Sequence, residues 1–495
     1  MPKNGVQTLK ARYVLPVLGP PIRDGLVRIA EDRIVAVEKA AGAAPAEDLG
    51  QVALLPGLIN AHTHLEFSLL DRPIGQPGVS FSQWVRLVVE GFRFELPKGQ
   101  PPDAAPRLPS PRVQKTEDVF GENGVRWPSA VKATEAGQGE LIRTGTTGVA
   151  EIAQPGFPFG LWRKTPMKAV VFLELRGPTR SRAFQAIQQA QDHLEAWLLP
   201  PSPPAGEGRV RGNMFSPTSG QEKQPEKNWG GQVAVAKAFD EHYPENRWQL
   251  GFSPHAPYTV RPELLEAAVA LAKKYRLPMA MHLAESPEEI QLLQSGQGPL
   301  HSLLEELGQW EPGLVLAPCR PLDYLRQLAK VERALVIHGN YLDEEEWAFL
   351  AARREQMAVV FCPRSHAHFD HPPYPLSEML QWGVRVILGT DSRASAPDTD
   401  MLAELRWAAA HFPQLAPQKI LELATLEAAQ ALGWGEELGA LAPGRRADLV
   451  AVAMPDQIDT DDPYELLLHH DLPVAAVWIA GQKVFPAGEA PYSEP

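Results

Sequence analysis

The stretch LLPGLINAHTHLEFS, residues 54–68, is an apolar segment that ends in two histidines, His62 and His64. Side chains at positions i and i+2 of a β-strand point to the same side of the strand. Both imidazoles would therefore leave the strand end in one direction, which suits the binding of one metal ion. The rest of the chain must then supply further ligands, a general acid or base, and a cavity.

Seven more short apolar runs follow, and helix-like segments separate them. The eight runs cover residues 54–64, 144–152, 167–175, 248–257, 277–285, 333–340, 357–365 and 384–392. Near-continuous Val, Ile and Leu runs are typical of parallel strands that are buried on both faces. Between them, RPELLEAAVALAKKY (261–275) has apolar residues at helical spacing, and SPEEIQLL (286–293) begins as a capping box. Eight such units predict an α/β fold, a (β/α)8 TIM-like barrel.

The two ends of the chain have a different pattern. GLVRIAEDRIVAVEK (25–39) and GALAPGRRADLVAVAM (439–454) contain short β-like runs with turn residues between them. We expect residues 1–53 and 438–495 to pair into one small composite β-sandwich. The barrel would then occupy residues 54–437.

Proline is concentrated in two places. The chain has 49 prolines, about twice the usual share. Many of them lie in residues 97–129 and 200–231, which lack apolar periodicity. We interpret both segments as disordered insertions, with docking of the first as an active-site lid as the alternative.

The overall composition narrows the class of protein. The chain has 495 residues and a formal net charge of −13, which argues against a nucleic-acid partner. It has only two cysteines, no apolar signal-peptide core and no apolar run of about 18 residues. We therefore expect a cytoplasmic protein, without membrane attachment, that acts on a small molecule.

Polar residues with metal or proton chemistry stand at the ends of five of the predicted strands or in the loops after them. They are His62 and His64 in the first run, His255 in the fourth, His282 and Glu285 in the fifth, His338 in the sixth and Asp391 in the eighth. In this fold, reactive residues lie at the carboxyl ends of the strands. A single strand-end His is usually structural, and a strand-end Asp is often a helix N-cap. Their conjunction at equivalent points favours a metal site.

The residue types fit a hydrolytic metal centre. Zn²⁺ or Fe²⁺ is held by neutral imidazole and carboxylate groups with one position open for water. A set that can supply this coordination is His62, His64, His282 and Asp391. Glu285 can carry a proton to the substrate, and His338 can hydrogen-bond the reacting centre. Spacing alone does not separate His255 from the metal ligands.

The motifs PGLINAHTHLE, SPHAPYT, MHLAES, VIHGNYL and GTDSRAS resemble the amidohydrolase superfamily, in particular its mononuclear deaminase and chlorohydrolase branch. The resemblance covers nearly the whole chain except the two insertions. It implies a metal-dependent aminohydrolase that holds one divalent ion, Zn²⁺ with Fe²⁺ as the alternative. It assigns the metal ligands as above, gives Glu285 the proton shuttle and Asp391 and His338 catalytic roles, and makes His255 a substrate contact. A homodimer is expected by analogy.

Within this branch the motifs look like those of deaminases of adenosine-type compounds, including aminodeoxyfutalosine. The predicted reaction is hydrolytic deamination of an amino-substituted heterocycle. Alternatives are a chlorohydrolase, a cyclic-amide hydrolase, or a non-catalytic scaffold relative. In the relatives the seventh strand commonly ends in Pro-x-Ser-Asn, whereas here the text is CPRSHAHFDHPP (362–373). One interpretation is a loop that is rich in histidine by accident. The other is that Arg364 and His366 are substrate contacts, and a second metal site at His366, His368 and His371 is a further alternative.

Overall fold

Eight parallel strands form the central sheet, one in each of the eight apolar runs. They are β6 (Leu58–Thr63), β9 (Thr146–Ala153), β10 (Lys168–Leu175), β11 (Trp248–Pro254), β12 (Met279–Leu283), β13 (Ala334–His338), β14 (Met357–Phe361) and β15 (Val386–Leu388). Each strand pairs in parallel with the next in chain order. The backbone N–H groups of Thr390 and Asp391 donate to the carbonyl of His62, at 3.2 and 3.0 Å. This contact joins the last strand to the first and confirms the predicted barrel.

The computed structural model of the chain describes residues 5–40, 45–93, 119–120, 126–127, 130–155, 157, 159–198, 248–455 and 460–486. The predicted insertion 200–231 lies outside the described residues. The predicted insertion 97–129 also lies outside them, apart from a short antiparallel pair, β7 (Val119–Phe120) and β8 (Arg126–Trp127).

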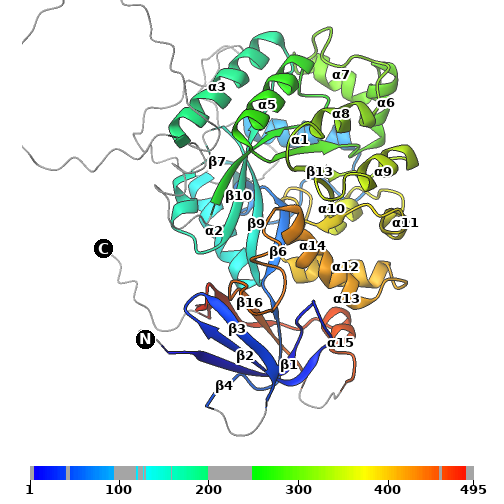
Figure 1. Ribbon diagram of the computed structural model, residues 1–495. Coiled ribbons are helices and arrows are strands. Elements are labelled where there is room, and N and C mark those ends of the chain that lie inside the picture. The colour runs from blue at the N-terminus through cyan, green and yellow to red at the C-terminus, as the bar shows by residue number, and fades with distance from the viewer. Residues whose placement is uncertain are drawn as a thin grey trace, which may run out of the picture.

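Helices surround the barrel and follow its strands (Figure 1). The α-helices are α1 (Phe81–Arg93), α2 (Ala130–Arg143), α3 (Arg180–Leu198), α5 (Pro262–Tyr275), α6 (Pro287–Ser295), α7 (Pro299–Glu306), α8 (Pro321–Leu328), α9 (Glu344–Ala351), α10 (Pro363–His368), α11 (Leu376–Gln381), α12 (Met401–His411), α13 (Pro417–Leu423), α14 (Leu426–Ala431) and α15 (Pro463–His469). Two 3₁₀ turns are η1 (Leu65–Phe67) and η2 (Phe159–Arg163). The predicted helices at 261–275 and 286–293 correspond to α5 and α6.

Alternate residues of the barrel strands pack on opposite faces. Ala280 of β12 and Leu335 and Ile337 of β13 belong to the cluster that fills the barrel interior. Met279 and Val336, one position away, belong to the larger cluster under the helices. This alternation follows from the period of two in a strand. It directs His282, two residues after Ala280, into the barrel mouth.

The two chain ends share one further sheet, as predicted. Its strands are β1 (Gln7–Val14), β2 (Ile22–Ala30), β3 (Arg33–Lys39), β4 (Glu47–Asp48), β5 (Val52–Pro56), β16 (Leu449–Ala453), β17 (Val474–Ile479) and β18 (Gln482–Phe485). In Figure 1 this sheet lies below the barrel, with strands from both ends of the chain side by side. Strand β5 pairs with β1 and β16, so the apolar run that begins at Leu54 divides at Gly57 between the two sheets.

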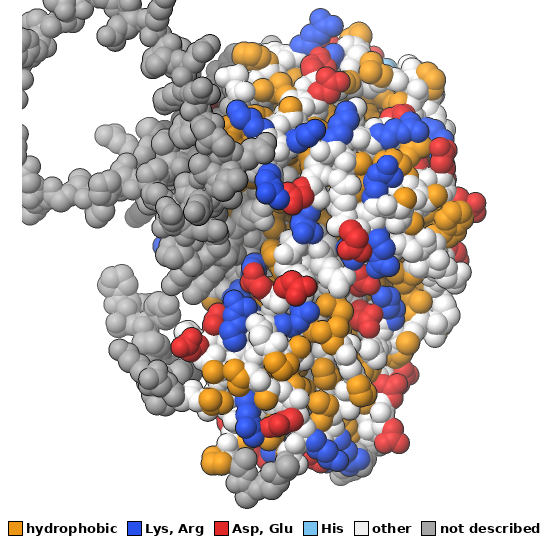
Figure 2. Space-filling view, in the orientation of Figure 1, with side chains coloured by type: hydrophobic (Ala, Val, Ile, Leu, Met, Phe, Trp, Pro, Cys, Tyr) orange, Lys and Arg blue, Asp and Glu red, His pale blue; other side chains and the backbone are white. Residues whose placement is uncertain are grey.

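The surface carries charges of both signs. Figure 2 shows Lys and Arg side chains interspersed with Asp and Glu over the barrel helices and the terminal sheet on the face in view. Among the described residues, none of the helices is both long and apolar enough to cross a membrane.

Candidate functional site

Four imidazoles converge at the carboxyl end of the barrel. His62 lies at the end of β6, and its ring centroid is 4.8 Å from that of His64, 5.0 Å from that of His282 and 5.7 Å from that of His338. All four side chains are buried. The structure therefore brings together the histidines that the sequence placed on three different strands.

Asp391 completes this group from the loop after β15. Its Oδ1 atom is 3.4 Å from Nε2 of His62 and 3.8 Å from Nε2 of His64. Its Oδ2 atom accepts hydrogen bonds from the hydroxyls of Ser365 (2.8 Å) and Ser395 (2.7 Å). The two serines therefore hold one carboxylate oxygen while the other faces the histidines. Burial opposes ionisation of Asp391, but the neighbouring imidazoles, His62 above all, hold its pKa below the ordinary value.

The backbone is unusual at two of these positions. His338 and Asp391 have φ angles of 67° and 62°, in the left-handed region that residues other than glycine seldom adopt. Leu335 and Ile337 already point into the barrel, so a regular strand would direct His338 away from it. The left-handed turn brings its ring to within 5.5 Å of the ring of His282. Such strain is characteristic of functional sites.

The donor set fits one metal ion. Both ring nitrogens of His62 are buried and have no hydrogen-bond partner among the described residues. Nδ1 of His282 hydrogen-bonds the carbonyl of His255 at 3.0 Å, which leaves Nε2 available as a ligand. Burial, with the neighbouring His62, lowers the pKa of His64 to about 3 and that of His282 well below its ordinary value. Neutral imidazoles beside a carboxylate are the ligands that such ions require.

Glu285 and His338 lie together beside the metal group. Oε1 of Glu285 is 3.4 Å from Nε2 of His338, and both side chains are buried. Burial, with Asp391 and Glu289 nearby, raises the pKa of Glu285 well above 4.5. Burial lowers the pKa of His338 to about 3. The site therefore holds a carboxylic acid that keeps its proton at higher pH than an exposed Glu, next to a neutral imidazole.

Three supporting side chains were not anticipated from the sequence. Glu289 of α6 is fully buried, and its carboxylate accepts the backbone N–H groups of Ala284 (2.8 Å) and Glu285 (3.0 Å). The hydroxyl of Tyr374 donates to the carbonyl of His338 at 3.1 Å. Asn340 donates to the carbonyl of Glu285 at 2.9 Å. Glu289 and Tyr374 carried no metal or strand-end signal. Asn340 closes the sixth predicted run and stands in the motif VIHGNYL, but the sequence did not indicate its partner.

Asn60 fastens the first barrel strand to the last. Its amide nitrogen donates to the hydroxyl of Thr390 at 2.8 Å, and its oxygen accepts the N–H groups of Thr390 (3.1 Å) and His62 (3.3 Å). These contacts lie directly beside His62 and Asp391, two of the candidate metal ligands. The Asn in the NAHTH motif was a recognisable signal, but the sequence did not indicate its partner.

The structure gives Arg364 a different setting from the predicted substrate contact. Its guanidinium donates to Glu404 (2.6 Å) and to both oxygens of Asp398 (2.5 and 3.0 Å). Glu404 is fully buried. An arginine engaged in this way serves chiefly to hold α10 against α12. We therefore correct the interpretation of Arg364 to a structural one.

The histidines of the same loop also separate into different roles. Nε2 of His368 lies 3.1 Å from the carbonyl of Ile74, which ties α10 to the loop before α1. Nδ1 of His371 lies 3.0 Å from the hydroxyl of Tyr341. His366 is buried, 5.2 Å ring to ring from His371, and both histidines are close enough to lower the pKa of His338. The role of His366 as a substrate contact stays a prediction.

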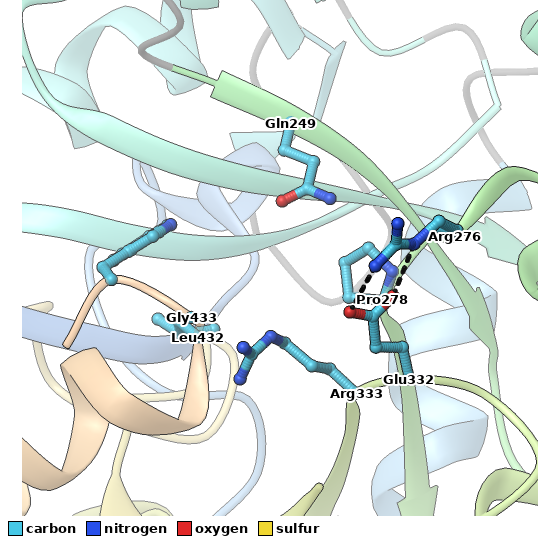
Figure 3. A pocket seen from close by; sticks show the side chains of 8 residues that line it. Gln249, Arg276, Pro278, Glu332, Arg333, Leu432 and Gly433 are labelled. Carbon is cyan, nitrogen blue, oxygen red and sulfur yellow. Dashed lines mark hydrogen bonds and ion pairs between the residues drawn. The ribbon is translucent and has the colours of Figure 1, made fainter. Parts of the chain in front are cut away.

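A separate pocket of ≈ 250 Å³ lies at the other end of the barrel (Figure 3). Its lining includes Gln249 near the start of β11, Pro278 before β12 and Arg333 before β13. Arg276 and Glu332 pair there through two hydrogen bonds of 2.9 and 3.0 Å. The pocket is at the amino ends of the strands, so it is not part of the candidate site.

A (β/α)8 barrel with buried histidines, an aspartate and a proton-retaining glutamate at its carboxyl end defines a metal-dependent hydrolase. The model of the amidohydrolase family matches residues 53–484, so the chain belongs to the amidohydrolase family. It is an enzyme of the deaminase-containing part of that family.

Sequence relatives cover most of the chain. It is 27% identical over 465 residues to a 5-methylthioadenosine/S-adenosylhomocysteine deaminase of Moorella thermoacetica, covering 90% of this chain and 85% of that one. It is 26% identical over 391 residues to an aminodeoxyfutalosine deaminase of Deinococcus radiodurans, covering 77% and 73%.

Solved structures share the fold. The aminofutalosine deaminase of Helicobacter pylori in complex with methylthio-coformycin has a TM-score of 0.68 and 19% identity, covering 97% of this chain and 100% of that one. An adenosine deaminase of Xanthomonas campestris with bound zinc has a TM-score of 0.64 and 23% identity, covering 96% and 92%.

Proposed function

We propose that the protein catalyses hydrolytic deamination of an amino-substituted heterocycle, with an adenosine-type nucleoside as the substrate. The observation that carries this proposal is the buried Glu285–His338 pair beside the histidine and aspartate group. Such a pair can deliver a proton to a ring nitrogen, which hydrolysis of an aromatic carbon–nitrogen bond requires. The names of the Moorella and Deinococcus relatives support this substrate class, with aminodeoxyfutalosine as one candidate.

One divalent ion would be held by His62, His64, His282 and Asp391. When bound, it supplies Lewis-acid chemistry and a water nucleophile at neutral pH. Zn²⁺ is our choice, supported by the zinc in the Xanthomonas structure, and Fe²⁺ suits the same ligands.

The chain's own groups then move the protons. Asp391, ionised because of its imidazole neighbours, accepts a proton from the attacking water. Glu285, kept protonated by burial, donates to the ring nitrogen beside the carbon that bears the amino group. His338 hydrogen-bonds the oxygen that adds to this carbon. The proton that Asp391 took from the water passes through Glu285 to the amino group, which leaves as ammonia, and the hydroxyl proton of the adduct returns to Glu285 as the carbonyl forms. His255 and His366 contact the substrate.

Ammonia release tests this proposal. Metal-replete enzyme is assayed with 5′-methylthioadenosine, S-adenosylhomocysteine, aminodeoxyfutalosine, adenosine and adenine. Glu285→Gln is expected to keep the metal and lose at least about 100-fold in kcat, the usual contribution of general acid–base catalysis. Glu288→Gln is the matched control, because Glu288 lies in α6, just after Glu285, and among the described residues its side chain accepts only the N–H of Ser82 (2.8 Å). A near-normal rate for Glu285→Gln would show that the assigned proton shuttle is wrong.

A further inference from the structure

The segment after β14, residues 362–375, is hydrogen-bonded to the turn that carries His338. The hydroxyl of Tyr374 donates to the carbonyl of His338 at 3.1 Å. The hydroxyl of Tyr341, three residues after His338, lies 3.0 Å from Nδ1 of His371. This segment contains the text CPRSHAHFDHPP, which departs from the Pro-x-Ser-Asn of the relatives. We name it the clasp segment, because two of its side chains bond to the chain at and just after this turn.

Packing restricts the side chain of Tyr374. It is buried, and its ring stacks on that of Phe361, with centroids 3.8 Å apart and an interplanar angle of 12°. The ring of His366 meets it edge to face at 5.7 Å. Phe361 is the last residue of β14, so the barrel itself sets the position of the tyrosine ring. Because the ring is already held, little further side-chain entropy is lost when its hydroxyl bonds.

The carbonyl at this contact belongs to a left-handed turn. His338 and Gly339 have φ angles of 67° and 62° in succession. A residue other than glycine keeps such a conformation only where its surroundings hold it. The N–H of Gly339 donates to the carbonyl of Leu283 at 3.1 Å, and the N–H of Tyr341 donates to that of Ala284 at 3.1 Å. Strand β12 and the loop after it therefore hold the N–H groups, and the clasp segment holds the carbonyl.

We propose that Tyr374 is a positioning residue that keeps His338 in its left-handed turn, and that this is the task of the clasp segment in the reaction. Regular strand geometry would direct the imidazole away from the barrel, whereas in this turn its Nε2 lies 3.4 Å from Oε1 of Glu285. Among the described residues, no group of three possible metal ligands includes a histidine of the clasp segment. The inference rests on the proposed function, in which His338 hydrogen-bonds the oxygen that adds to the substrate.

Tyr374→Phe removes the hydroxyl and keeps the packed ring. We expect kcat for ammonia release to fall about tenfold, because misplacement of a catalytic group is costly. KM should change little, since the hydroxyl is bonded to the backbone and not to the substrate. Tyr13→Phe is the matched control, because Tyr13 is buried in the terminal sheet and its hydroxyl accepts the N–H of Thr460 at 3.3 Å. A wild-type kcat in Tyr374→Phe, or an equal fall in both variants, would overturn the positioning role.

Ligand binding gives a readout that a loss of stability alone would not reproduce. Coformycin carries a hydroxyl on a tetrahedral ring carbon, as the substrate does once water has added, whereas the ring of inosine is planar. In calorimetry on metal-replete enzyme, Tyr374→Phe should bind coformycin about tenfold more weakly than the wild type and bind inosine with the same affinity. Equal weakening of both ligands would indicate a distorted pocket and would overturn the positioning role.

Hydrogen exchange tests the clasp independently of the reaction. In mass spectrometry of peptides that contain Gly339 and Tyr341, amide exchange should be about threefold or more faster in Tyr374→Phe than in the wild type, the effect of one lost hydrogen bond. Tyr341→Phe, which removes the contact with His371, should act in the same direction. Unchanged exchange in Tyr374→Phe would overturn the clasp. Absence of ammonia release and of coformycin binding in the wild type, with faster exchange in the variant, would refute the deaminase and leave the clasp standing.

Discussion

Replacement of Glu289 by Gln should change both stability and catalysis. The Glu289 carboxylate accepts one backbone N–H with each of its oxygens, from Ala284 and from Glu285. An amide keeps a single acceptor oxygen, so one of these buried N–H groups loses its hydrogen bond, a loss of about 1–3 kcal/mol. Ala284 has a φ angle of 54°, so this backbone segment depends on such support. Glu285 should become less well placed, and we expect kcat to fall about tenfold or more.

The stability effect should depend on pH in a defined direction. Burial raises the pKa of Glu289 from 4.5 to about 7. An acid with a raised pKa binds more protons in the folded state, so its contribution to stability is complete below pH 4.5 and is lost as the pH rises toward 7. Linkage with these two values gives a loss of roughly 2–3 kcal/mol between pH 5 and pH 8 in the wild type. Glu289→Gln cannot titrate and should not show this loss.

The assay is urea unfolding followed by tryptophan fluorescence at pH 5, 6, 7 and 8, for the metal-replete wild type and variant. Between pH 5 and pH 8 the unfolding free energy of Glu289→Gln should rise relative to that of the wild type by roughly 2–3 kcal/mol. Parallel curves, within about 0.5 kcal/mol, would refute the linkage reasoning.

Glu346 provides a matched control. It is also buried, and its carboxylate accepts two backbone N–H groups, from Leu322 (3.1 Å) and Asp343 (2.9 Å). It belongs to α9 and has none of the site residues as partners in these bonds. Glu346→Gln should therefore lower stability and leave kcat unchanged. An equal loss of kcat in both variants would mean that Glu289 acts through general stability and not through Glu285.

Further outcomes follow from the site. Ser365→Ala removes one of the two hydroxyls bound to Asp391 and should weaken metal binding about 10-fold or more. Competition with a chelator measures this affinity, and an unchanged value would show that Ser395 alone is sufficient. Arg364→Ala leaves Glu404 buried without its partner, so the unfolding free energy should drop by about 3 kcal/mol while KM stays the same. A raised KM would instead support the interpretation of Arg364 as a substrate contact. Removal of the metal with a chelator should abolish ammonia release, and Zn²⁺ should restore it.

Much of the architecture could be predicted because apolar patterning reports burial directly. The eight Val-, Ile- and Leu-rich runs each contain a barrel strand, and the β-like ends of the chain share one sheet. The division of the first run at Gly57 could not be predicted. Its residues are apolar on both sides of the glycine, but β5 pairs with β16, whose residues lie about four hundred positions away. Pairing partners at such separations leave no trace in local periodicity.

The candidate site can likewise be separated into what the sequence determined and what the tertiary structure decided. The sequence by itself determined which side chains are candidates for metal and proton chemistry, because a parallel barrel gathers its strand ends at one face and these residue types stand there. Only the tertiary structure decided the contacts that hold them. Asn60 bonds to Thr390, and the two serines bond to Asp391. Glu289 supports the backbone at Glu285, and Arg364 bonds to Glu404. These contacts depend on the direction of each side chain and on the closure of the barrel. That geometry arises only when distant strands pack together, and neither composition nor spacing encodes it.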